Sequence, residues 1–222
     1  KDIMKEQKFE SPTAPYYDER EIAWSPDGKY IAYTSKRLRG IDDARSTNSD
    51  IYLRELASGN EINITEGNGG YDRYPVFSPD GSKIAYQSME RNGYEADLDR
   101  LFVYDINNRS RTWITREWQF DVENISWADE RNIWFTCSHL GTAQIFRTDL
   151  NTGNVVKVTD GVHNLGPLSL RQGVLVSGIA SMSMAPEIAA VSMTSGEIRQ
   201  LTSINKPIYE SVRMGKVEEK YI

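Results

Sequence analysis

One stretch of sequence decides the fold: residues 22–35 read IAWSPDGKYIAYTS, and residues 75–88 repeat this pattern as PVFSPDGSKIAYQS. Weaker copies follow as ISWADERNIWF at 125–135 and LSLRQGVLVS at 168–177. A second pair of apolar segments follows each copy and closes on a threonine, at positions 65, 115, 159 and 202. These threonines are 50, 44 and 43 residues apart, so the chain contains four copies of one unit.

Each copy predicts four short β-strands, because its apolar segments are rich in β-branched and aromatic residues and are separated by turn residues. In the Ser-Pro-Asp-Gly turns, proline has a fixed φ that suits a turn, and Gly28 and Gly81 can adopt a positive φ. Turn residues also separate the third and fourth strands of each copy, at 58–59, 107–108, 152–153 and 195–196. No segment has sustained apolar spacing of 3.6 residues, so we expect very little helix.

Four-stranded units of this length are typical of β-propeller blades. We therefore expect an all-β fold, a β-propeller with four four-stranded blades present as a partial propeller or open arc. A β-sandwich with accidental similarity between its strands is the alternative fold, and a closed four-bladed ring is the alternative arrangement. The expected divisions are a leading segment at 1–21, blades at 22–66, 67–116, 117–160 and 161–203, and a linker at 204–222.

Composition narrows the classes of function and of site. The chain has 222 residues, with 26 Lys and Arg against 32 Asp and Glu, so its formal charge of −6 argues against nucleic acid as a partner. The apolar runs are too short for a transmembrane helix, so no membrane partner is expected. A single cysteine, Cys137, excludes an internal disulfide and a multi-cysteine zinc site, and we expect a buried thiol. The acidic pairs Asp42-Asp43 and Asp97-x-Asp99 lack the spacing of a calcium loop, so we expect neither a metal nor a cofactor.

The repeat resembles known families. The first copy resembles the propeller repeat that TolB-like proteins share with the prolyl oligopeptidase family of serine peptidases. The resemblance rests on the segment 24–33, on Ser-Asp-Ile-Tyr-Leu at 49–53 and on the closing Ile-Thr. Segments 46–52, 70–75 and 88–97 resemble the propeller of bacterial peptidases of the dipeptidyl peptidase 5 and acylaminoacyl peptidase type. The tail at 212–222 is similar to the segment in which that family leaves the propeller and enters an α/β-hydrolase domain.

The resemblance implies a propeller of seven or eight blades joined to a hydrolase domain with a Ser-Asp-His triad. No two glycines here are four residues apart, so the Gly-x-Ser-x-Gly elbow of such a nucleophile is absent. Without it, His139 and His163 have no triad to serve, and we expect no peptide hydrolysis by this chain alone.

The resemblance therefore implies a non-catalytic part of a serine dipeptidyl or oligopeptidase that gates access and binds the N-terminus of the peptide. Its partners would be its own hydrolase domain, the remaining blades and a peptide substrate, and open blade faces could let the chain self-associate. Family members are often exported, which favours a periplasmic or otherwise exported location. The alternative is a TolB-like scaffold for protein–protein interaction without any catalytic domain.

Long loops indicate which face of the blades binds. The loops between strands two and three (36–49 and 89–100) and between blades (66–73 and 116–123) lie on one face, and long loops on a rigid scaffold commonly carry function.

An enzyme that removes dipeptides must neutralise the substrate's α-amine, which a partly shielded carboxylate does best. The candidates are Glu90 and Glu95, together with Arg91 and Tyr94 beside them. The alternative is that these glutamates cap the loop or pair with Arg91 and Arg100.

Two further aromatic residues and two aspartates complete the set of candidates. Tyr16 and Tyr17 precede the first blade and could line a subsite or pack under a loop. Asp50 and Asp99 occupy matching positions before the third strands of their blades, which predicts a bond to neighbouring backbone rather than a binding role.

Overall fold

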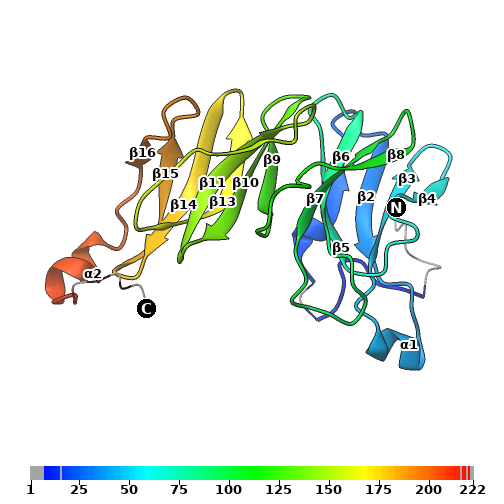
Figure 1. Ribbon diagram of the computed structural model, residues 1–222, viewed down its shortest axis with the longest axis horizontal. Helices are drawn as coiled ribbons and strands as arrows, with labels where there is room; N and C mark the ends of the chain where they lie inside the picture. The colour runs from blue at the N-terminus through cyan, green and yellow to red at the C-terminus, as the bar shows by residue number, and fades with distance from the viewer. Residues whose placement is uncertain (1–7, 16, 216, 219, 221–222) are drawn as a thin grey trace. The chain divides into compact units, whose positions relative to one another are not determined.

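The computed structural model describes residues 8–15, 17–215, 217–218 and 220 of the chain (Figure 1). It is all-β, as predicted, and in the described part the helices are short: a 3₁₀ turn at Glu19–Glu21, α1 at Gly40–Arg45 and α2 at Lys206–Ser211. None of the helices described is long and apolar enough to cross a membrane. The chain divides into two compact units, Lys1–Val122 with Asp129–Arg131, and Glu123–Ala128 with Asn132–Ile222.

Unit one contains two antiparallel four-stranded sheets in which neighbouring strands follow one another along the chain. The first sheet comprises β1 (Ile22–Trp24), β2 (Tyr30–Ser35), β3 (Asp50–Glu55) and β4 (Glu61–Asn63). The second comprises β5 (Asp72–Phe77), β6 (Lys83–Ser88), β7 (Arg100–Asp105) and β8 (Ser110–Trp113). These are the first two of the four predicted four-stranded blades.

Unit two repeats the pattern. Its first blade comprises β9 (Glu123–Trp127), β10 (Asn132–His139), β11 (Thr142–Asp149) and β12 (Val155–Lys157). Its second comprises β13 (Asn164–Arg171), β14 (Val174–Ser181), β15 (Met184–Val191) and β16 (Ile198–Gln200). One parallel bridge, between Ala143 and Asn164, joins these two blades into a continuous eight-stranded sheet. A parallel bridge between Ser49 and Tyr71 joins the blades of unit one.

The Ser-Pro-Asp-Gly segments form the predicted hairpin turns. The Asp27 carboxylate accepts hydrogen bonds from Ser25 Oγ at 2.7 Å and from the Lys29 N–H at 3.0 Å, and Gly28 has a φ of +70°. Asp80 makes the same two contacts in the second blade, with Ser78 Oγ and the Ser82 N–H. Because all of these contacts lie within five residues, the turn is encoded locally and survives as a repeat.

The recurrent threonine closes each blade. Its Oγ1 accepts the N–H of the residue 14 positions earlier, at 2.9–3.1 Å: Ile51 to Thr65, Leu101 to Thr115, Ile145 to Thr159 and Ile188 to Thr202. The side chain thereby satisfies a backbone donor of strand three that the short fourth strand does not reach. This equivalence makes Asp50 the counterpart of Arg100, so the matching of Asp50 with Asp99 was wrong by one residue.

Apolar side chains fill the space between the two blades of unit one. The buried cluster there combines Ile51 and Leu53 of β3 with Ile84 and Tyr86 of β6 and Tyr104 of β7. These residues alternate along their strands because successive side chains of a strand point to opposite faces. Cys137, on β10, is a fully buried free thiol, as predicted.

Candidate functional site

The two long loops of unit one, 36–49 and 89–99, bond to each other and form what we call the loop surface. Asn92 Oδ1 accepts hydrogen bonds from Ser46 Oγ at 2.7 Å and from the Thr47 N–H at 3.0 Å. In return, Thr47 Oγ1 accepts the N–H of Gly93 at 2.9 Å. Loops from two blades are therefore fixed against each other by side chains more than 40 residues apart in the sequence.

Asp97 holds the 89–99 loop in shape from within. Its side chain is only 2% exposed, and its Oδ2 accepts the N–H groups of Glu90 at 2.8 Å and Arg91 at 2.9 Å. Its Oδ1 accepts the Leu98 N–H at 2.9 Å and pairs with Arg91 Nη2 at 3.1 Å, and Arg100 Nη1 lies 3.5 Å from Oδ2. One carboxylate thus replaces the backbone partners that an irregular loop lacks.

The environment keeps Asp97 ionised. Burial by itself would raise the pKa of this carboxyl, but the hydrogen bonds from Arg91, Glu90 and Leu98 outweigh burial and hold the pKa well below its ordinary value. The folded state therefore binds this proton less readily than the unfolded chain does. The resulting stabilisation is present above the ordinary aspartate pKa and is lost only in strong acid.

Glu90 pairs with Arg100, which is one of the two uses that the sequence left open. Its Oε2 lies 3.2 Å from Arg100 Nη2, and the guanidinium is itself held by the Leu98 carbonyl at 3.0 Å. Arg100 is 13% exposed, whereas the Glu90 side chain is 72% exposed. The carboxylate is therefore oriented by the partly buried Arg100 and remains accessible to a cation from solvent.

The other candidates on this loop are at the surface. The Arg91 guanidinium carbon lies 4.0 Å from the centre of the Tyr94 ring, and Arg91 pairs with Asp97 rather than with a glutamate. Tyr94 is 47% exposed and Glu95 is exposed as well. The structure thus brings together Glu90, Arg91, Tyr94 and Glu95 on one loop, with Glu95 farthest along it.

The predicted candidates Tyr16 and Tyr17 precede the first blade. Tyr17 is 57% exposed and donates a hydrogen bond from its hydroxyl to Glu10 Oε2 at 3.3 Å. Tyr16 lies outside the described residues. Glu21 anchors the segment that carries them, since its carboxylate accepts hydrogen bonds from the N–H and the Oγ1 of Thr13.

Sequence reasoning missed Asn92 and Asp97, the two residues that shape the loop surface. The sequence shows only that the pair Asp97-x-Asp99 lacks the spacing of a calcium loop, whereas in the structure N–H groups and guanidinium groups use both oxygens of Asp97. No group of three or more metal-binding side chains occurs in the part of the chain that the structure describes. The Asn-Gly pair at 92–93 was a visible turn signal, but its bonds to the other loop depend on the fold.

The corresponding face of unit two is differently built. Its blades join strands two and three by short turns, at 140–141 and 182–183, instead of long loops. A cavity of about 650 Å³ opens there, and its lining consists of small or uncharged residues: Ser138, Gly141–Ala143, Asn164–Pro167, Gly178–Ala180 and Pro186. None of the described residues that line this cavity is ionisable.

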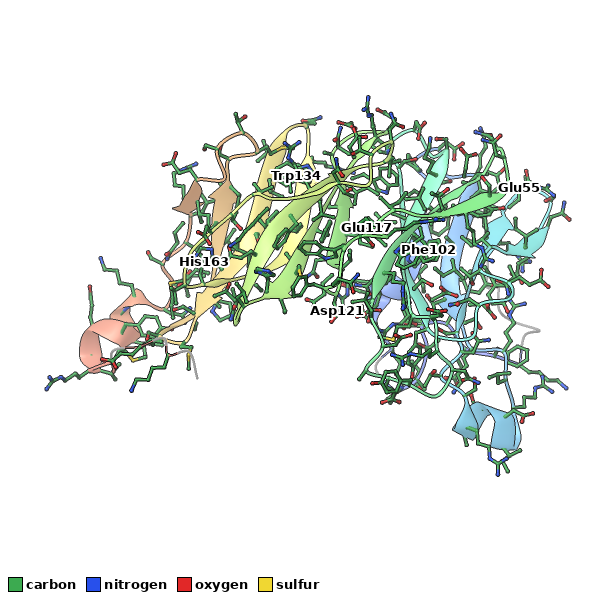
Figure 2. The ribbon with its side chains drawn as sticks, viewed as in Figure 1. Glu55, Phe102, Glu117, Asp121, Trp134 and His163 are labelled. Carbon is green, nitrogen blue, oxygen red and sulfur yellow. The ribbon has the colours of Figure 1, made fainter. Side chains whose placement is uncertain are left out.

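His139 and His163 both belong to unit two, and His163 packs against the turn that precedes β13. His163, labelled in Figure 2, lies so close to Gly161 that a Cβ on that glycine would be 2.6 Å from its ring. Burial lowers the pKa of His163, although the nearby Asp160 carboxylate acts in the opposite direction. The main-chain carbonyl of His163 lies 3.3 Å from Gln144 Nε2, which helps to fix the turn before β13.

Residues 21–209 match the model of the TolB beta propeller domain family. Two curated relatives, both called dipeptidyl-peptidase 5, come from Porphyromonas gingivalis and Porphyromonas endodontalis. The first is 37% identical over all of this chain and 33% of the relative, and the second is 35% identical over 93% of this chain and 30% of the relative. The chain thus spans about a third of the length of these relatives.

A solved structure with the same architecture is that of acylaminoacyl peptidase from Pyrococcus horikoshii. It superposes with a TM-score of 0.67 at 21% identity, over 86% of this chain and 28% of that one. At this identity the likeness concerns the fold, and it confirms the β-propeller class predicted from the repeats.

Proposed function

Because the chain belongs to the TolB beta propeller domain family, we propose that it is the propeller part of a serine dipeptidyl or oligopeptidase, where it gates access to the active site and binds the peptide N-terminus. The observation that carries this proposal is the loop surface. Two blades contribute long loops to it, and an accessible carboxylate, Glu90, projects from a rigid base. The similarity of the whole chain to proteins called dipeptidyl-peptidase 5 supports the same class.

The chemistry of the loop suits an ammonium group. Glu90 is oriented by Arg100, and its backbone N–H is held by Asp97, so little conformational entropy is lost when a ligand binds. The exposed ring of Tyr94, which lies against Arg91 on the same loop, offers an apolar face for a side chain of the peptide. Glu95 is a second carboxylate on the same loop, with no such support from below.

In this proposal the catalytic residues come from a hydrolase domain outside this sequence, and the partners of the propeller are that domain and further blades. The alternative is a TolB-like scaffold that binds protein partners through the same loops. The family match by itself is compatible with this alternative. The two functions differ in their requirement for a free amine on the ligand.

Replacing Glu90 by glutamine in the full-length protein is expected to lower kcat/KM for a peptide with a free N-terminus by roughly tenfold to hundredfold. The variant keeps the size of the side chain but loses the charge-assisted bond to the ammonium group, which is worth about 1.5–3 kcal/mol. The N-acetylated form of the same peptide should lose little, because it carries no ammonium group. Steady-state kinetics on the two peptides measures the difference.

Glu197→Gln is the matched control, because Glu197 is an exposed glutamate in the turn between β15 and β16. It should leave both rates unchanged. Equal losses on the free and blocked peptides in Glu90→Gln would remove Glu90 from amine recognition.

A further inference from the structure

A buried carboxylate lies at the base of the loop surface. Asp72, the first residue of β5, is 1% exposed. Its Oδ2 accepts a hydrogen bond from Asn68 Nδ2 at 3.0 Å, whereas its Oδ1 is buried and has no hydrogen-bond partner. An ionised carboxylate with one unsatisfied oxygen in such a place is costly, because the side chain is shielded from solvent and no ion pair with another described residue compensates its charge.

The groups around Asp72 compensate the charge of an ionised carboxylate only in part, through hydrogen bonds from the Ser88, Asn68 and Thr65 side chains. On β3, the Asp50 carboxylate adds a second negative charge, and its Oδ1 accepts the hydroxyl of Thr65 at 3.2 Å. On β6, Ser88 and the Tyr86 hydroxyl face Asp72, and neither carries a charge at neutral pH. Arg111 of β8 interacts with the Tyr86 hydroxyl.

Asp72 is also where the loops of unit one meet. Its N–H donates to the carbonyl of Ser49, the last residue of the 36–49 loop, at 3.0 Å. Asn68, its side-chain partner, donates at 2.7 Å to the carbonyl of Met89, the first residue of the 89–99 loop. The same segment passes so close that a Cβ on Gly70 would be 2.5 Å from the Met89 oxygen. A displacement of Asp72 or Asn68 therefore disturbs hydrogen bonds to both the 36–49 loop and the 89–99 loop.

We propose that Asp72 is protonated when the loop surface is closed, and that its ionisation loosens the 36–49 and 89–99 loops. A neutral carboxyl keeps one oxygen for Asn68 and carries no charge beside Asp50. An ionised carboxylate is repelled by Asp50 and draws water toward the base of the loops. The loop surface is therefore a pH-sensitive element, whatever ligand it binds.

The titration range follows from the surroundings. Burial, with a smaller contribution from the Asp50 charge, raises the pKa of Asp72 to about 7 despite the hydrogen bonds from Ser88 and Asn68. Since the folded pKa lies above the unfolded value of 3.8, the folded state binds the extra proton between these two values. The stabilisation is complete below the unfolded pKa and is lost as the pH rises to about 7.

Asp72→Asn tests this mechanism, because an amide mimics the protonated acid: its oxygen accepts from Asn68 and its NH₂ takes the place of the O–H. Between about pH 5 and 7, the unfolding equilibrium constant of the wild type should rise by roughly fivefold to tenfold per pH unit relative to that of the variant. Glu21, whose pKa is also raised, and His163, whose pKa is lowered, contribute equally to the pH dependence of stability in both proteins, so their contributions cancel in this comparison.

Hydrogen exchange at the loop amides reports on the loops themselves. After correction for intrinsic exchange, the Glu90, Arg91 and Gly93 amides of the wild type should lose tenfold or more of their protection between pH 6 and 8.5, and those of Asp72→Asn should not. Asp50→Asn removes the neighbouring charge, so the pH at which half of the loop protection is lost should be lower in this variant than in the wild type. The proposal would be overturned if the unfolding equilibrium constants of wild type and Asp72→Asn had the same pH dependence. It would also be overturned if the loop amides of the wild type kept the same protection from hydrogen exchange between pH 6 and 8.5.

Discussion

Replacing Asp97 by alanine is expected to lower the free energy of unfolding of unit one by about 3 kcal/mol. The change removes the acceptor of three backbone N–H groups, those of Glu90, Arg91 and Leu98. It also leaves Arg100, which is 13% exposed, without one of its two carboxylate partners. Urea denaturation followed by tryptophan fluorescence measures the loss.

Glu95→Ala is the matched control, because Glu95 is an acidic residue of the same loop that is exposed to solvent. It should change stability by less than about 0.5 kcal/mol. The loss in Asp97→Ala should also be local, with faster hydrogen exchange at the Glu90, Arg91 and Leu98 amides. If Asp97→Ala were as stable as Glu95→Ala, the assignment of Asp97 as the organiser of the loop would be wrong.

The second large effect is expected in unit two, where Gly196→Ala should cost about 3 kcal/mol or more. Gly196 lies in the turn between β15 and β16 and has a φ of +72°, which disfavours any residue with a Cβ. A Cβ at this position would also be only 1.9 Å from the carbonyl oxygen of Val158, which follows β12 in the preceding blade. Backbone atoms cannot move aside without separating the two blades.

Gly173→Ala separates these two causes. Gly173 has a φ of +76°, similar to that of Gly196, but a Cβ there would meet nothing within 4 Å. Its replacement should cost only the conformational strain, about 1 kcal/mol. Thermal unfolding of the two variants gives the comparison, and equal losses would show that the contact between Gly196 and Val158 is not tight.

The repeated parts of this fold could be predicted because their bonds are local. The hydrogen bonds of the Asp27 and Asp80 turns are complete within a few residues. Thr65 and Thr115 each accept the N–H of the residue 14 positions earlier in the chain. Such interactions leave the same residue type at the corresponding position of each copy of the repeat that retains them. Strand order, turn positions and low helix content all follow from them.

The candidate site could be predicted only in part. Sequence reasoning located the 89–99 loop and left two uses open for Glu90, and the structure shows the pairing with Arg100. The role of Asp97 depends on the path of an irregular loop, and that of Asn92 on a contact with another blade. The buried Asp72 is not distinguishable by sequence from the many exposed aspartates, because burial is a property of the assembled unit.

The most direct test of the proposed function is the product analysis of one unblocked peptide incubated with the full-length protein and, separately, with this 222-residue chain. Mass spectrometry identifies the fragments. The account predicts that the full-length protein releases dipeptides or short peptides and that this chain alone releases none. An intact peptide after incubation with the full-length protein would contradict the peptidase assignment and leave the TolB-like scaffold as the function of the chain.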